Sequence, residues 1–163
     1  MPETNQIAQL NEILNDLVIV NFRELKTLKK TISKLKNADQ DLVPVFDYMV
    51  MECRHHINNL MILDFSKGKE GHTSVRNYEL NETDDRNGGA IAIRWAMSVT
   101  EIADRERELL IATAINTIAA SLFAYETALE NTNIQNANPL IQRDLNIQMS
   151  NFKKFLRRLK NLK

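Results

Sequence analysis

Glycine is scarce in this chain and confined to one short window, and this distribution restricts the fold more than any other feature. The 163 residues include three prolines and four glycines, which are Gly68, Gly71, Gly88 and Gly89. Sheet proteins need frequent turns, and turns favour glycine and proline. Neither glycine pair has the spacing of a dinucleotide-binding or phosphate-binding loop. The sequence therefore predicts an all-α protein and argues against Rossmann and P-loop enzymes.

The composition is that of one soluble domain. Hydrophobic residues make up 44% of the chain, and 21 basic side chains are balanced by 21 acidic ones. We therefore expect a single domain over residues 1–163, without the basic excess of a dedicated nucleic-acid-binding protein. The one cysteine, Cys53, excludes an internal disulfide and a cysteine-built zinc site.

The sequence gives no sign of export or of a membrane span. Residues 1–11 lack the basic and apolar regions of a secretory signal. The longest uncharged run, Leu109–Tyr125, is shorter than a typical span and contains hydroxyl and amide side chains. We expect it to be a buried helix of a cytoplasmic protein with no transmembrane segment.

Apolar residues recur at helical spacing in four long segments, and a shorter apolar segment carries Trp95. Asn138 and Pro139 supply a cap and a first-turn proline for the last helix. The predicted long helices cover residues 5–36, 44–66, 104–131 and 139–162, and the short helix covers residues 90–100. The long connection at 67–89 lets the second and third long helices run parallel, as in ferritin-like proteins. The predicted fold is a ferritin-like four-helix bundle with a long crossover and a short extra helix.

Three segments carry a family resemblance. They are Leu10–Leu17 with Asn21, the Arg94–Trp95 pair after Gly88 and Gly89, and Ala124–Glu130. Together they resemble a bacterial ferritin-like four-helix family that is catalogued as a domain of unknown function. The resemblance implies a ferritin-like fold and no established activity. Relatives of this kind tend to carry several acids in the middle of the third long helix, where this chain reads Thr113–Ala119 without one.

Three polar residues interrupt the apolar seams of two predicted helices. They are Asn21 and Glu24 in the first helix and Gln148 in the last. A buried carboxylate needs hydrogen bonds or a counter-charge, so we expect a buried polar cluster. The cluster fits a structural role that fixes helix register. The alternatives are a degenerate metal-ligand position and a working catalytic acid, although no second carboxylate lies on a seam.

A carboxylate-bridged iron or manganese site is the sharpest chemical hypothesis. Such a site needs glutamates from two helices and a Glu-x-x-His motif from each of the other two. The chain offers one such motif, Glu52 with His55, together with Glu24 and Glu126. Helical geometry points Glu52 and His55 away from the core stripe, so the motif fits a solvated face better than a metal site.

Small and apolar side chains on outward faces predict a homodimer. Rows of small residues in the third long helix let another helix approach closely, and either the Trp95 helix or a second subunit could cover them. Large apolar side chains on the second helix point outwards. The predicted interface residues are Tyr48, Met51, Ile62, Thr113, Thr117, Ala120 and Ala124.

Basic residues gather at the ends of the first and last helices. Cations complement the negative end of a helix dipole, which is sufficient reason for their presence. Ferritin-like connectivity would bring both ends to one pole, and the balanced net charge of the chain argues against a nucleic acid or an anionic membrane as the partner of this pole. The residues of this basic pole are Lys26, Lys30, Lys34, Lys153, Lys154, Arg157 and Arg158.

These patterns favour a non-catalytic protein. The leading prediction is a structural or protein-interaction module that has no cofactor and no catalytic residue. The first alternative is an iron-binding or manganese-binding protein of the oxidase or storage class. The second is a binder of a small ligand or an anionic surface.

Overall fold

The structure is a computed structural model that describes residues 2–63, 88–99 and 106–162. Its helices are α1 (Pro2–Ser33), a 3₁₀ helix η1 (Asn37–Leu42), α2 (Val43–Leu63), α4 (Ala90–Ser98), α5 (Arg107–Glu130), α6 (Thr132–Gln135) and α7 (Pro139–Lys160). The described residues contain no strand, which confirms the all-α prediction. Most of the predicted crossover, at 67–87, lies outside the described residues, as do the predicted helix ends at 64–66 and 104–105.

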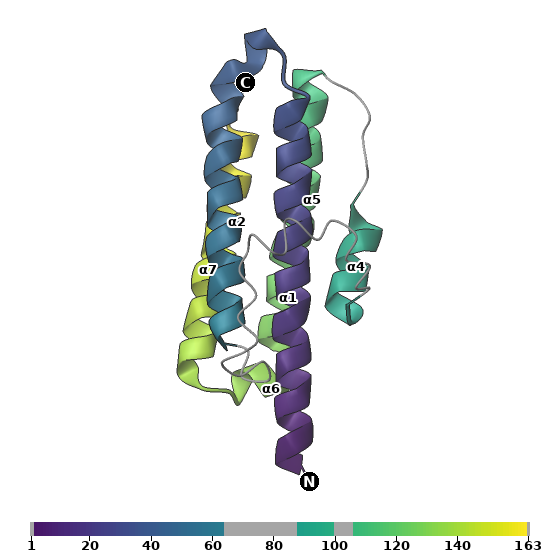
Figure 1. Cartoon of the computed structure of the whole chain (residues 1–163), viewed down its shortest axis with the longest axis vertical. Coiled ribbons are helices and arrows are strands. Elements are labelled where there is room, and N and C mark those ends of the chain that lie inside the picture. Colours follow the sequence, from purple (N-terminus) through teal and green to yellow (C-terminus); the bar gives the residue numbers. More distant parts are fainter. Residues whose placement is uncertain (1, 64–87, 100–105, 163) are drawn as a thin grey trace.

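The four long helices lie side by side (Figure 1). Helices α1 and α7 run in one direction, and α2 and α5 run in the other, so α2 and α5 are parallel. Helix α1 packs against α2 and α5, and α7 packs against α5 and α2. The C-terminal ends of α1 and α7 therefore lie at the same end of the molecule.

The buried faces of α1, α2 and α7 follow the apolar spacing of the sequence. On α1, Leu14, Leu17 and Leu28 are fully buried. The core positions of α7 are at the predicted helical spacing: Ile141, Leu145, Gln148, Phe152, Phe155 and Leu159. Leu162, the last position of the predicted seam, lies beyond the end of the helix and is half-buried. Asn138 caps this helix by accepting a hydrogen bond from the Leu140 amide, and Pro139 occupies its first turn. The predicted start of the last helix is thus confirmed.

Helix α5 is the one described helix that is long and apolar enough to cross a membrane. It is buried on more than one face, by α7, α1 and α4. Its hydroxyl groups face polar side chains of α1 and α4. Thr117 and Ser121 both bond Glu24 on α1, and Ser121 also accepts a hydrogen bond from Trp95 on α4. In the structure α5 therefore packs as a core helix.

The short helix α4 begins at a cap supplied by a different helix. Its N-cap residue is Gly89, and the carboxylate of Asp16 on α1 accepts a hydrogen bond from the Gly89 amide at 2.6 Å. Gly88 has a φ of 66°, and a Cβ there would lie 2.6 Å from that of Ala92. At Gly89, a Cβ would lie 2.7 Å from the Asp16 carboxylate. Both glycines are needed because α4 starts in close contact with α1.

Replacing Asp16 by alanine is expected to loosen α4 selectively. The substitution removes the acceptor at the helix start, and loss of such a cap costs about 1 kcal/mol. Amide protection of α4 in hydrogen exchange should fall roughly fivefold, while that of α7 is unchanged. Asp16→Asn keeps one acceptor oxygen and should retain most of the protection, and Asp47→Ala on the exposed side of α2 is the control. Equal loss of protection in α4 and α7 would contradict this account.

Candidate functional site

A chain of hydrogen bonds crosses the core and joins all four long helices. The Asn21 amide on α1 donates to the hydroxyl of Tyr125 on α5 at 2.8 Å, and this hydroxyl donates to the Gln148 carbonyl oxygen on α7. On its other side, Asn21 Oδ1 lies 3.0 Å from Nδ1 of His56 on α2. His56 Nε2 lies 3.0 Å from the side-chain amide of Asn151 on α7. We call these five residues the polar chain.

The direction of the polar chain follows from the donors and acceptors that each group offers. The Asn21 amide nitrogen donates to the Leu17 carbonyl and to Tyr125, so its oxygen must accept from His56. His56 therefore carries its proton on Nδ1 and accepts from Asn151 at Nε2. Burial lowers the pKa of His56 to about 3, and burial raises the pKa of Tyr125 well above its usual range. Both groups are therefore uncharged near neutral pH.

A second polar group lies about one helical turn further along α1, around Glu24. Its two carboxyl oxygens lie 2.9 Å from the Thr117 hydroxyl and 3.1 Å from the Ser121 hydroxyl. The indole nitrogen of Trp95 on α4 donates to Ser121 at 2.9 Å. Burial raises the pKa of Glu24 to about 8, although these hydroxyls act in the opposite direction. Glu24 is thus mainly protonated at pH 7, and its proton can be donated to Ser121.

The three predicted cluster residues are all buried, but they belong to two separate groups. Asn21 and Gln148 meet through Tyr125, whereas Glu24 faces the hydroxyls of α5. The polar chain and the Glu24 group are neutral near pH 7, and hydrogen bonds link the members of each. Among the described residues, Nε2 of Gln148 is buried without a hydrogen-bond partner. Such groups can fix the relative positions of helices, and Glu24, the one carboxyl group among them, is fully buried.

The structure does not bring the four predicted metal ligands together. Glu24 is buried against α5, whereas His55 and Glu126 are exposed on different helices. Glu52 is half-buried and accepts a hydrogen bond from Asn151 at 3.3 Å. Within the described ranges, no group of three His, Cys, Asp or Glu side chains is close enough to share a metal ion. The predicted outward orientation of His55 agrees with its exposure.

The predicted dimer interface divides into exposed and buried residues. Tyr48, Met51 and Ile62 on α2 are 52%, 53% and 65% exposed. On α5, Thr113, Thr117 and Ala124 are buried within the chain, and Ala120 is half-buried in a depression beside α4. For these four α5 residues the interface stays a prediction, and α1 and α4 of the same chain already pack against α5.

The C-terminal ends of α1 and α7, the parts of the chain that carry the predicted basic residues, lie at the same end of the molecule (Figure 1). Lys153, Lys154, Arg157 and Arg158 near the end of α7 are all exposed. Two acidic residues near the start of α2, Asp39 and Asp41, pair with Arg107. Arg107 at the start of α5 forms a two-pronged ion pair with Asp41, with both distances 2.8 Å, and contacts Asp39 at 3.3 Å.

Several members of the two polar groups were not predicted as site residues. Tyr125 falls in the apolar stripe of its helix, and His56 lies beside the stripe that contains Cys53 and Ile57. Asn151 lies one turn after Gln148 on α7, and this spacing is the one signal that links it to the predicted cluster. Burial raises the pKa of the Cys53 thiol, which therefore stays protonated in the core.

Comparisons with protein-family models, with curated proteins and with solved structures find no match to this chain.

Proposed function

We propose that this protein is a ferritin-like helical bundle that acts as a structural or protein-interaction module rather than as an enzyme. The observation that carries this proposal is the neutral polar core. In carboxylate-bridged metal proteins the centre of the bundle supplies several ionised ligands. Here the uncharged side chain of Asn21 bonds both His56 and Tyr125 at the centre of the same kind of helix arrangement. The parallel direction of α2 and α5 supports the ferritin-like connectivity.

The proposed partner is a second copy of the chain, bound through the outer face of α2. Tyr48, Met51 and Ile62 lie at helical spacing on this face, together with the exposed His55. Tyr48 is oriented by an edge contact with Phe155, whose ring centre is 6.1 Å away. A two-fold axis across α2 would bury these side chains against their own copies, since a two-fold interface uses the same patch on both subunits.

Light scattering at micromolar concentration tests the proposed dimer. We expect a mass of twice 18.8 kDa, and we expect Met51→Lys to halve it, because a lysine would place a charge in the centre of the apolar stripe. The matched control is Met97→Lys on α4, where the methionine is 81% exposed. A monomeric wild-type protein, or a dimer lost with the control and kept with Met51→Lys, would contradict the proposal.

Metal analysis tests the non-catalytic part of the proposal. Protein purified without a histidine tag is expected to contain no stoichiometric iron or manganese. Bound metal that is lost on Glu24→Ala would overturn the proposal in favour of the metal-binding alternative.

A further inference from the structure

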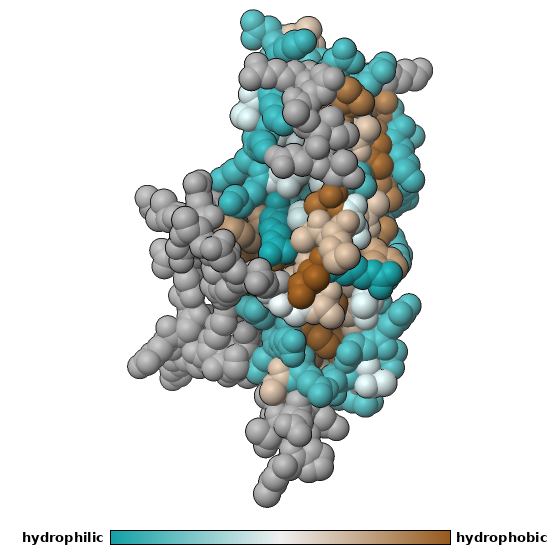
Figure 2. Space-filling view, turned by 90° about the vertical axis from the view of Figure 1, so that its right-hand side faces the viewer, coloured by the Kyte–Doolittle hydropathy of each residue, from teal (hydrophilic) through white to brown (hydrophobic). Residues whose placement is uncertain are grey.

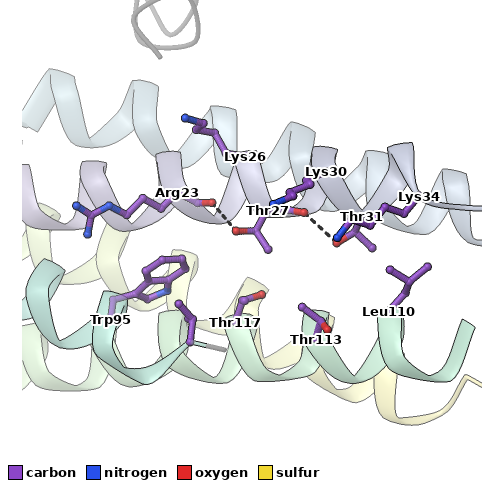
Figure 3. A pocket seen from close by; sticks show the side chains of 11 residues that line it. Arg23, Lys26, Thr27, Lys30, Thr31, Lys34, Trp95, Leu110, Thr113 and Thr117 are labelled. Carbon is purple, nitrogen blue, oxygen red and sulfur yellow. Dashed lines mark hydrogen bonds between the residues drawn. The ribbon is translucent and has the colours of Figure 1, made fainter. Parts of the chain in front are cut away.

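A basic groove lies between α1, α4 and α5 (Figure 3). Its volume is about 440 Å³, which is within the range of small-molecule sites. The lining residues from α1 extend from Arg23 to Lys34, roughly 16 Å at 1.5 Å per residue. The groove is therefore elongated along the helix axis.

One wall of the groove is cationic. Arg23, Lys26 and Lys30 of α1 and Lys34, the residue directly after it, follow one another at spacings of three or four residues, so they share one side of that helix. Among the described residues, the lining contains no aspartate or glutamate. Arginine and lysine side chains carry several N–H donors each, so they can bind an anion in addition to a partner within the protein.

The opposite wall is mostly apolar. It is lined by Trp95, Val99 and Leu110. Trp95 and Leu110 are largely buried. Figure 3 shows Thr27 and Thr31 of α1 across from Trp95, Thr113 and Thr117. The hydroxyls of the first two donate to carbonyl groups of α1, at 3.0 Å and 2.9 Å.

These threonines therefore add methyl groups more than donors to the groove interior. Thr113 does the same on α5, where its hydroxyl donates to the Leu109 carbonyl at 2.8 Å. The groove thus combines an apolar interior with donors along the α1 wall, and both are needed to hold a ligand with an apolar body and a charged end.

Glu24 lies directly behind the floor of the groove, since its hydrogen-bond partner Thr117 lines the groove. Burial raises the pKa of Glu24 to about 8, so this carboxyl group places little negative charge beneath the groove at pH 7. The positive charge of the α1 wall is therefore not cancelled from below.

We propose that this groove binds an amphipathic carboxylate with an elongated apolar body, such as a medium-chain fatty acid. The apolar chain lies along Trp95, Val99 and Leu110, and the carboxylate is held by the cationic residues of α1. This assignment concerns a ligand site and is independent of the proposed dimer face on α2.

A titration of the full chain with decanoate, kept below its micelle concentration, tests the proposal. Trp95 is the chain's single tryptophan and lines the groove, so its fluorescence reports occupancy directly. We expect a saturable emission change with one site per chain by calorimetry. Affinity for decan-1-ol should be at least tenfold weaker, and decanoate binding should weaken as salt is added.

Paired charge reversals locate the site. Lys30→Glu with Lys34→Glu is expected to weaken decanoate binding at least tenfold while leaving decan-1-ol binding within twofold. Lys153→Glu with Lys154→Glu, at the same pole but outside the groove, is the control and should leave both unchanged. No saturable change, equal affinity for the alcohol, or equal loss in the control would each overturn the proposal.

Discussion

Replacing Asn21 by leucine is expected to destabilise the protein by about 3 kcal/mol, although leucine suits a buried position. The substitution leaves the buried Nδ1–H of His56 without its acceptor and removes the donor to Tyr125. An unsatisfied buried polar group costs about 1–3 kcal/mol, and the loss affects contacts with two other helices. Urea unfolding followed by circular dichroism measures the change.

Two further variants separate loss of the polar chain from other effects of the substitution. Asn146→Leu makes the same exchange at an exposed position of α7 and should change stability by less than about 0.5 kcal/mol. The double variant Asn21→Leu with His56→Leu removes both ends of the hydrogen bond, so it should be more stable than the sum of the single changes predicts. An unchanged or increased stability of Asn21→Leu would show that the polar chain does not hold the helices together.

The same region shows what could be predicted from sequence. Asn21, Glu24 and Gln148 were identifiable because each interrupts a regular apolar seam, and all three are buried. Their partners were not identifiable, because a hydrogen bond between helices depends on how the helices are placed around the core. Tyr125 and Thr117 are one example, since helical spacing alone does not tell which of them faces Asn21 and which faces Glu24.

Helix α5 shows a further limit of periodicity. Its residues are apolar on nearly all sides, so the spacing did not define one buried face, and two sets of small residues could be assigned to a second subunit. The side chain of Trp95 resolves this choice, because its indole bonds Ser121 and brings α4 over that side of α5. The exposed large apolar residues of α4 and α5 are Ile93, Met97 and Phe123. Figure 2 shows apolar surface on the side of the molecule that carries α4.

Local signals were more informative at helix ends. Asn138 with Pro139 marks the start of α7, and Gly88 with Gly89 marks the start of α4. The role of Asp16 in capping α4 could not be predicted, because the cap comes from a residue 73 positions earlier in the chain. The short helix α6 was also missed, since four residues are too few to show periodicity.

Glu24 and His56 should give the protein a stability maximum between about pH 4.5 and 6.5, with losses on both sides. Burial raises the pKa of Glu24 from 4.5 to about 8, so between these values the folded protein holds a proton that the unfolded chain has released. Stability due to Glu24 therefore falls as pH rises, by about 1.4 kcal/mol per pH unit. Burial lowers the pKa of His56 from 6.5 to about 3, so its contribution has the opposite sign and rises with pH over that window.

The contributions of Glu24 and His56 to the free energy of unfolding offset each other between pH 4.5 and 6.5, where both groups change it with pH. Outside this range only one of the two groups contributes a slope. Between pH 6.5 and 8 only the Glu24 slope remains, and the free energy of unfolding should fall by about 2 kcal/mol. Glu24→Gln should abolish this fall, because the amide is isosteric with the protonated acid and never ionises. Its oxygen can accept from Thr117 and its nitrogen can donate to Ser121, so both hydrogen bonds are preserved.

Urea unfolding at a series of pH values compares the two proteins. The Glu24→Gln variant should be more stable than the wild type at pH 8 by roughly 4 kcal/mol and equal to it near pH 4, since only the wild type must bury or protonate a carboxylate. Glu126→Gln, on the exposed side of α5, is the matched control and should follow the wild type throughout. Parallel profiles for wild type and Glu24→Gln between pH 6.5 and 8 would contradict this prediction. They would mean that Glu24 is already ionised in the folded protein, with its carboxylate stabilised by the hydroxyls of Thr117 and Ser121.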